Sequence, residues 1–395
     1  MAKIIFHIDV NSAFLSWTSV EHLKNQSGPD LRDIPAIIGG DQTNRHGIVL
    51  AKSIAAKKFG IYTSEPIVSA LKKCPDLVIF PPDHKMYSRY SHMLMDYLHT
   101  LTPDIEQVSI DECYLDFTGI AHLYESPLAA AHKIKDTVYE RFGFTVNIGI
   151  SVNKLLAKMA SDFQKPNRVH TLFPPEIPQK MWPLPIEELH MAGRSSTQTL
   201  KKLGLHTIGD LANTDVTLLG SHLKSHGRLL WEYANGIDER PVESVPAKAK
   251  GIGNSTTLSK DALTLQEVKP VLRTLADSVG RRLRKAGQTA GCICVEIKYS
   301  NFISTSHQMP LQPPVNSNDR IYQASLELFA ALWNGDPIRL LGIRTTHLED
   351  EGAPVQLSLF DIDWKKNEKQ HKLDAALDKI RQKYGEESVK RGSDM

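Results

Sequence analysis

The stretch VSIDECYLDF, residues 108–117, places two acidic side chains, Asp111 and Glu112, inside an apolar run. Aliphatic and aromatic residues surround them, a composition typical of a buried β-strand. Burying an unpaired carboxylate is costly in free energy or forces the group to take up a proton. The two acids therefore need a compensating cation, or a place at the end of the strand where water reaches them.

A third acid, Asp9, ends another predicted strand, KIIFHID at residues 3–9. Three carboxylates gathered on one sheet repel each other unless a cation lies between them, and Mg²⁺ suits such oxygen ligands. A pair of these ions can activate the attacking oxygen and stabilise the leaving oxygen in phosphoryl transfer. Because consecutive strand residues point to opposite faces, Asp111 and Glu112 can share a site only if the chain bends there. Spacing alone leaves metal binding and solvated acids at a strand end about equally open.

The bulk composition indicates an ordinary soluble protein. A chain of 395 residues predicts two to four domains, and 41% hydrophobic with 23% charged residues is typical of globular proteins. No apolar run approaches the ~20 residues of a membrane span. The start, MAKIIFHIDV, does not resemble a signal peptide, so we expect a cytoplasmic protein.

Hydrophobic periodicity predicts an α+β architecture. Besides the two strands above, TVNIGISV reads as a strand. Helices are expected in HKMYSRYSHMLMDYLHTL (residues 84–101), from Pro127 to the stop at Gly143, and after the cap at Asn153. This order suits a sheet with helices on one face and residues 17–75 as an inserted domain. Short helices follow in 174–240, then a Pro-, Ala- and Lys-rich linker at 241–251, a separate α+β domain at 252–350 and a charged helical tail.

Two features of the later segments bear on nucleic acid. Glycine-marked turns at Gly193 and Gly204 flank a short helix, an arrangement whose backbone amides can hold a DNA phosphate, although a plain helical hairpin fits equally well. Residues 248–300 hold ten Lys or Arg against four Asp or Glu, with the densest cluster in RRLRK, 281–285. Basic residues at a helix end also complement the helix dipole, so this cluster leaves DNA binding open.

Three stretches in order, HIDVNSAF, SIDECYLDF and NKLLAKMASDFQKPN, resemble the Y-family translesion DNA polymerases, close to the bacterial DNA polymerase IV and UmuC branches. The resemblance runs through roughly residues 3–345. It implies a right-hand polymerase that adds deoxynucleotides to primer-template DNA opposite damaged bases, with two Mg²⁺ ions and without proofreading. The implied domains are a ferredoxin-like palm (1–16 and 76–168), small fingers (17–75), a helix-hairpin-helix-like thumb (169–240), a linker (241–251), an α+β little finger (252–350) and a clamp-binding tail (351–395).

The resemblance also assigns roles to individual residues. It implies that Asp9, Asp111 and Glu112 are the catalytic metal ligands, with the Val10 carbonyl as a further ligand. Phe14 matches the aromatic side chain that excludes a 2′-hydroxyl, and Lys165 matches a lysine that contacts the triphosphate. The remaining implied contacts are Asn11, Ser12, Ala13, Ser53 and Lys57 with the nucleotide, and Gly193, Gly204, Arg281, Arg282 and Arg284 with DNA.

Four positions depart from the family pattern, one of them Met191, which stands where the thumb hairpin usually has its first glycine. Ile54 and Lys57 stand where Tyr and Arg usually contact the triphosphate: Ile54 cannot donate a hydrogen bond, and Lys57 lacks the fork of an arginine. Asn11 replaces a common Asp that is not one of the three catalytic acids. The departures at Ile54 and Lys57 predict weaker nucleotide binding or a different set of contacts.

The sequence QLSLF, residues 356–360, is similar to the peptide by which bacterial polymerases bind the sliding clamp. Leu357, Leu359 and Phe360 would bury in an apolar groove while Gln356 bonds at its rim. We expect a monomer with no membrane partner. The alternative is a catalytically weak accessory factor that binds DNA and the clamp; the intact acidic triad favours the enzyme, and Ile54 is the one feature that favours the alternative.

Overall fold

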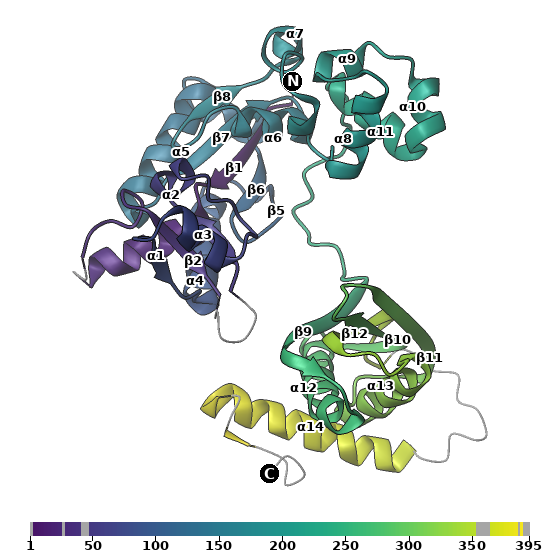
Figure 1. The fold of residues 1–395 in the computed structure, drawn as a ribbon. Helices are drawn as coiled ribbons and strands as arrows, with labels where there is room; N and C mark the ends of the chain where they lie inside the picture. Colours follow the sequence, from purple (N-terminus) through teal and green to yellow (C-terminus); the bar gives the residue numbers. More distant parts are fainter. Residues whose placement is uncertain (1–2, 26–27, 41–46, 353–363, 386–387, 390–395) are drawn as a thin grey trace. The chain divides into compact units, whose positions relative to one another are not determined.

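The computed structural model describes residues 3–25, 28–40, 47–352, 364–385 and 388–389, with only the backbone described for 364–372. The chain divides into two compact units, Met1–Gly40 with Gly47–Pro246, and Ala247–Met395 (Figure 1). The boundary between them lies inside the predicted linker. Each unit is described separately below.

The first unit is built around a five-stranded sheet of order β5-β6-β1-β7-β8. The central strand β1 runs antiparallel to β6 and β7, and β7 runs parallel to β8. The strands are β1 (Ile5–Val10), β5 (Ile105–Gln107), β6 (Glu112–Asp116), β7 (Val146–Ser151) and β8 (Val169–Thr171).

Helices cover both faces of this sheet. On one face Phe6 and Ile8 of β1 join a buried core with side chains of α1 (Ala13–Lys24), α4 (His84–His99) and α5 (Pro127–Phe142). On the other face α6 (Lys154–Asp162) approaches β7 so closely that a Cβ at Gly149 would lie 2.0 Å from the Ala157 carbonyl oxygen. Helices on both faces differ from the predicted single layer, because β1 buries both of its faces.

A smaller three-stranded sheet, of order β3-β2-β4, packs with two short helices. Its strand β4 pairs with β2 beyond residue 75, where the fingers were expected to end, and Trp17, from the expected fingers, packs in the core of the large sheet instead. The elements are β2 (Ala36–Gly39), β3 (Val49–Lys52), β4 (Val78–Phe80), α2 (Ile54–Lys58) and α3 (Ile67–Lys73).

The rest of the first unit is helical, as predicted for 174–240. Its apolar side chains form a core with Leu155, Leu156 and Met159 of α6. The segments are η2 (Pro174–Glu176), α7 (Ile177–Lys180), η3 (Ile186–Glu188), α8 (Arg194–Lys202), α9 (Ile208–Ala212), α10 (Val216–Leu223) and α11 (Ser225–Ala234). The short η1 (Thr118–Leu123) packs instead on the core of the five-stranded sheet.

The second unit is an antiparallel sheet of order β11-β10-β12-β9 with its own core. Two helices, α12 and α13, pack their apolar faces against the strands, and α14 lies against α12. The elements are β9 (Gly251–Ala262), α12 (Leu265–Lys285), β10 (Gln288–Tyr299), β11 (Ser304–Val315), α13 (Asn318–Leu332), β12 (Ile338–Asp350) and α14 (Trp364–Tyr384). Within the described residues, none of the helices combines the length and apolarity that crossing a bilayer requires.

Candidate active site

The candidate site lies where β1 and β6 meet on the face covered by α6. Alternation along β1 turns Phe6 and Ile8 into the main core, which leaves His7 and Asp9 on the opposite face. Glu112, the first residue of β6, pairs directly with Asp9 in the antiparallel register. Opposed residues of an antiparallel pair share a face, so the two carboxylates lie side by side although they are far apart in the sequence.

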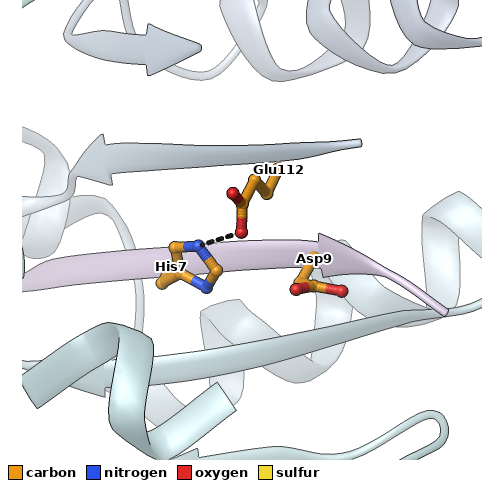
Figure 2. Close-up of side chains that lie close together, drawn as sticks. All are labelled: His7, Asp9 and Glu112. Atoms are coloured by element: carbon orange, nitrogen blue, oxygen red, sulfur yellow. Dashed lines mark ion pairs between the residues drawn. The ribbon is translucent and has the colours of Figure 1, made fainter. Parts of the chain in front are cut away.

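Figure 2 shows His7 and Asp9 on one strand and Glu112 on its neighbour. Ligand atoms of these three residues lie within 4.8 Å of one another, the one such group found among the described residues. His7 Nε2 is 3.2 Å from Glu112 Oε2, and His7 Nδ1 is 2.8 Å from Ser161 Oγ on α6. His7 therefore connects the helix to one of the predicted metal ligands.

Two lysines from α6 and the loop after it neutralise part of the acidic charge. Lys158 Nζ lies 3.2 Å from Asp9 Oδ2 and 2.9 Å from Glu112 Oε2. Lys165 Nζ lies 3.1 Å from Asp9 Oδ1, and both lysines also pair with Asp162. Lys165, which the resemblance assigns to the triphosphate, therefore lies beside Asp9, and Lys158 is an additional residue of the site.

Neighbouring charges lower the pKa of Glu112 and raise the pKa of Lys158, so each partner is stabilised in its charged form. The hydrogen bond from His7, followed by Lys158, lowers the pKa of Glu112 to about 2 although burial opposes it. Burial lowers the pKa of Lys158, but Asp9 and Asp162 outweigh it and raise that pKa overall. Burial also lowers the pKa of His7. At neutral pH the Glu112 carboxylate is therefore charged and able to bind a divalent cation.

Asp111 lies in a bend immediately before β6, which is the geometry that the sequence required. Its carbonyl accepts a hydrogen bond from the Val10 amide (3.0 Å), so it is held against the end of β1. Its carboxylate accepts a 2.6 Å hydrogen bond from Ser109. The side chain lines a pocket rather than joining the group of His7, Asp9 and Glu112.

This pocket, called here the Phe14 pocket, has a volume of about 210 Å³ and is lined by Ser12, Ala13, Phe14, Leu50, Ala51, Lys52, Thr63 and Asp111. The Phe14 ring stacks on Tyr87 with 4.3 Å between ring centroids, so its position is fixed by the core. The turn that precedes it has Ser12 at φ 46°, and Ser16 donates a hydrogen bond to the Asn11 carbonyl. The predicted nucleotide residues 12–14 therefore lie together beside Asp111.

The other residues predicted to bind the nucleotide either form hydrogen bonds within the fold or lie outside this pocket. Asn11 is buried, and its amide bonds Asn147, Thr145 and the backbone of Asn167. Ser53 caps α2 and also bonds the backbone of Ile34 and Ala36. Lys57 is exposed and is not among the lining residues. The side chains of Asn11 and Ser53 therefore stabilise the fold around the pocket. Lys52 lines the pocket, although the sequence did not predict it as a nucleotide-binding residue.

The predicted DNA contacts lie on helices of different units. Gly193 caps the start of α8, and Gly204, with φ +80°, follows its end. In the second unit the predicted contacts Arg281 and Arg282 lie on α12, and Arg282 bonds the Gly253 carbonyl. Arg284 is 6% exposed and paired with Asp378 of α14 at 2.7 Å, so its guanidinium is engaged in packing that helix; the expected contact with DNA is not supported for this residue.

The charged helix predicted for the tail is present as α14. The charged helical segment, α14, packs on α12 through Asp374 and Asp378. The predicted clamp-binding residues Gln356, Leu357, Leu359 and Phe360 lie outside the described residues.

Comparisons with known proteins agree with this geometry. The impB/mucB/samB family matches residues 8–162, and the C-terminal domain of the same family matches residues 249–359. The chain belongs to the impB/mucB/samB family. A DNA polymerase IV of Clostridium acetobutylicum is 46% identical over 391 residues, covering 99% of this chain and 98% of the relative. One of Alkaliphilus oremlandii is 37% identical over 401 residues, covering 100% and 99%.

A solved Y-family DNA polymerase chimera has the same fold, with a TM-score of 0.77 and 23% identity. The likeness covers 88% of this chain and 100% of the chimera. The multidomain α+β fold class and the Y-family resemblance are confirmed, and so is the enzyme class, a DNA-directed DNA polymerase. The individual domain boundaries and site residues remain predictions.

Divalent metal fits the donors found here. The oxygens of Asp9 and Glu112 are the hard ligands that Mg²⁺ prefers, and Asp111 is held beside them by the backbone bond to Val10. His7 could have been found from its place two residues before Asp9 on the same strand face. Lys158 could not, because only the packing of α6 on the sheet brings it to the acids.

Proposed function

We propose that this protein performs template-directed translesion DNA synthesis, adding deoxynucleotides opposite damaged bases by two-metal phosphoryl transfer without proofreading. The observation that carries the proposal is the pair of carboxylates, Asp9 and Glu112, held side by side next to Asp111 at the strand ends. The names of the DNA polymerase IV relatives support the same activity.

Asp9, Asp111 and Glu112, with the Val10 carbonyl, would hold two Mg²⁺ ions. When bound, these ions would activate the primer 3′-hydroxyl and neutralise charge on the phosphates. Lys165 would contact the triphosphate beside Asp9, since its ammonium is a mobile point charge. Lys158 would keep the Asp9 and Glu112 carboxylates together and lower their mutual repulsion.

Phe14 would set the choice of sugar. Its ring is fixed by stacking on Tyr87 and it lines the pocket next to Ser12 and Ala13. A ring that cannot move leaves no room for a 2′-hydroxyl, which would exclude ribonucleotides by steric clash. A Phe14→Ala variant should therefore incorporate ribonucleotides much better than the parent protein, at similar use of deoxynucleotides.

The partners we propose are primer-template DNA, deoxynucleoside triphosphates and the sliding clamp, for a monomer in the cytoplasm. The amides around Gly193 and Gly204, together with Arg281 and Arg282, would hold the duplex backbone. Gln356, Leu357, Leu359 and Phe360 would bind the clamp. Replacing Phe360 with Ala should reduce stimulation by the clamp far more than synthesis on a short primer.

Primer extension tests the proposal. The parent protein, with Mg²⁺ and all four deoxynucleotides, should extend primers on undamaged templates and past an abasic site, and Asp111→Ala should not. Absence of extension by the parent, with retained binding to DNA and the clamp, would favour the accessory factor. Ile54, in place of a usual Tyr, is the observation that keeps this second function in consideration.

A further inference from the structure

The Phe14 pocket has one basic side chain among its lining residues, and it is not the lysine that the family pattern indicates. Lys52 is the last residue of β3 and faces the pocket together with Thr63 and Asp111. Lys57, which stands at the position of the usual Arg, is exposed and does not line it.

Lys52 carries a positive charge that the described part of the chain does not pair. Its ammonium donates a 3.2 Å hydrogen bond to Thr63 Oγ1, and no described carboxylate lies within ion-pair distance of it. The acid that interacts with it, Glu65, is buried and bound to Lys73 at 2.7 Å. Burial and the charge of Lys57 both lower the pKa of Lys52, so an anion placed beside it would relieve an existing electrostatic cost.

We propose that Lys52 is the cation of the small sheet that binds the triphosphate of the incoming nucleotide. The inference rests on the proposed polymerase function and adds the residue that replaces the missing contacts at positions 54 and 57. A triphosphate carries several negative charges, and an ammonium with a free hydrogen-bonding capacity meets them directly. Ile54, with 51% of its surface exposed, supplies no donor.

The test is a nucleotide-binding measurement. A complex of the full chain with primer-template DNA ending in a dideoxynucleotide is titrated with each of the four deoxynucleoside triphosphates in Ca²⁺, and binding is followed by the fluorescence of a template 2-aminopurine. Lys52→Met should raise the Kd of all four about tenfold or more, because a hydrogen-bonded charge is lost. Lys52→Arg, which keeps the charge, should recover most of the affinity. Steady-state kinetics should show a raised KM with a smaller change in kcat.

Lys58→Met is the matched control, since Lys58 is an exposed lysine of the same segment and lies outside the pocket. It should bind nucleotides as the parent protein does, and Lys57→Met should lose less affinity than Lys52→Met. Thermal melting checks that each variant is folded. If Lys52→Met does not fold, Lys52→Gln takes its place in the binding measurement.

Two results would overturn the inference. Unchanged Kd values in Lys52→Met would exclude a contact, and a loss confined to one of the four nucleotides would place Lys52 on a base instead of the triphosphate. Either result leaves the proposed function standing if the parent protein extends primers. A parent protein that neither binds nucleotides nor extends primers would instead reject the polymerase function itself.

Discussion

Two ionic clusters of this protein have the same charge composition, but one is the candidate active site and the other joins two packed helices. The β1–β6 cluster consists of Asp9, Glu112, Asp162, Lys158 and Lys165. The α12–α14 cluster consists of Asp277, Asp374, Asp378, Arg284 and Arg381. Each has three carboxylates and two cations, so the count of charges cannot tell which of them is a site.

The type of cation separates the two, whereas exposure does not, since Asp277 and Asp378 of the α12–α14 cluster are 16% and 20% exposed. In the β1–β6 cluster the Asp9 and Glu112 side chains are 14% and 25% exposed, and lysines with flexible stems neutralise them. In the α12–α14 cluster Asp374 is fully buried and Arg284 is 6% exposed. A lysine can swing away when a metal ion or phosphate arrives, whereas a buried arginine fork fixes one packing arrangement. Carboxylates whose partners are displaceable lysines therefore indicate the reactive site.

The largest effect, on the rate of nucleotide incorporation, should follow from removing one acid of the β1–β6 cluster. Asp9→Asn should lower the single-turnover rate of nucleotide incorporation about a thousandfold or more, because bound metal supplies several kcal/mol of transition-state stabilisation. The fold should be retained, since an amide can still accept from Lys158. A rate within tenfold of the parent, measured by rapid quench, would mean that Asp9 is not a metal ligand.

The matching change in the α12–α14 cluster should affect stability. Arg284→Ala removes the guanidinium that pairs with Asp374 and Asp378 in the packed interface, so the free energy of unfolding of the second unit should fall by about 3 kcal/mol. Urea unfolding with hydrogen exchange over α12 and α14 measures it. Arg282→Ala, on the exposed side of the same helix, should cost about 1 kcal/mol or less. Equal losses of unfolding free energy in the two variants would show that the cluster does not stabilise the packing of α14 on α12.

A smaller effect should come from His7, which supports the acids without being one of them. His7→Phe should weaken Mn²⁺ binding about tenfold, because groups that hydrogen-bond a metal ligand commonly contribute that much. His7→Gln, which can still donate a hydrogen bond, should recover part of the loss. Electron paramagnetic resonance of Mn²⁺ titrations gives the affinity, and identical values for all three proteins would contradict this role.

The smallest effect concerns an ion pair outside both clusters, which gives a baseline for surface charges. The hydrogen bond from Arg32 lowers the pKa of Asp30 from 3.8 to about 2. Because the folded-state pKa is depressed, the stabilisation is present above pH 4 and is lost as the pH falls toward 2. After solvent screening, Asp30→Asn should cost about 1 kcal/mol at pH 7 and much less at pH 2. Urea unfolding at both pH values checks this, and a cost independent of pH would contradict it.

Local signals in the sequence predicted the elements whose ends are fixed locally. Ser126, Pro127 and Gly143 predicted the bounds of α5, and the structure shows the Ser126 cap and Gly143 at φ 79°. The strand β11 had no such signal, because Pro310, Pro313 and Pro314 argue against a strand. These prolines are tolerated at a sheet edge, where one side of the strand needs no ladder hydrogen bonds.

In the candidate site, too, the sequence predicted the local elements but not the contacts that depend on the tertiary fold. The apolar runs around Asp9 and Glu112 predicted two strands, but only the register of β1 against β6 pairs the carboxylates, and register depends on the whole sheet. The family resemblance supplied that pairing in advance. It pointed to Lys57 rather than Lys52, because the orientation of a lysine at the end of β3 depends on how the small sheet packs beside Phe14.

The most direct test of the central claim is a crystal structure of the protein with primer-template DNA, an unreactive nucleotide analogue and Mn²⁺, with the ions located by anomalous scattering. The account predicts two manganese ions between Asp9, Asp111 and Glu112 and the phosphates of the nucleotide. Ions that bind elsewhere, or an Asp111 carboxylate that contacts neither of them, would contradict it.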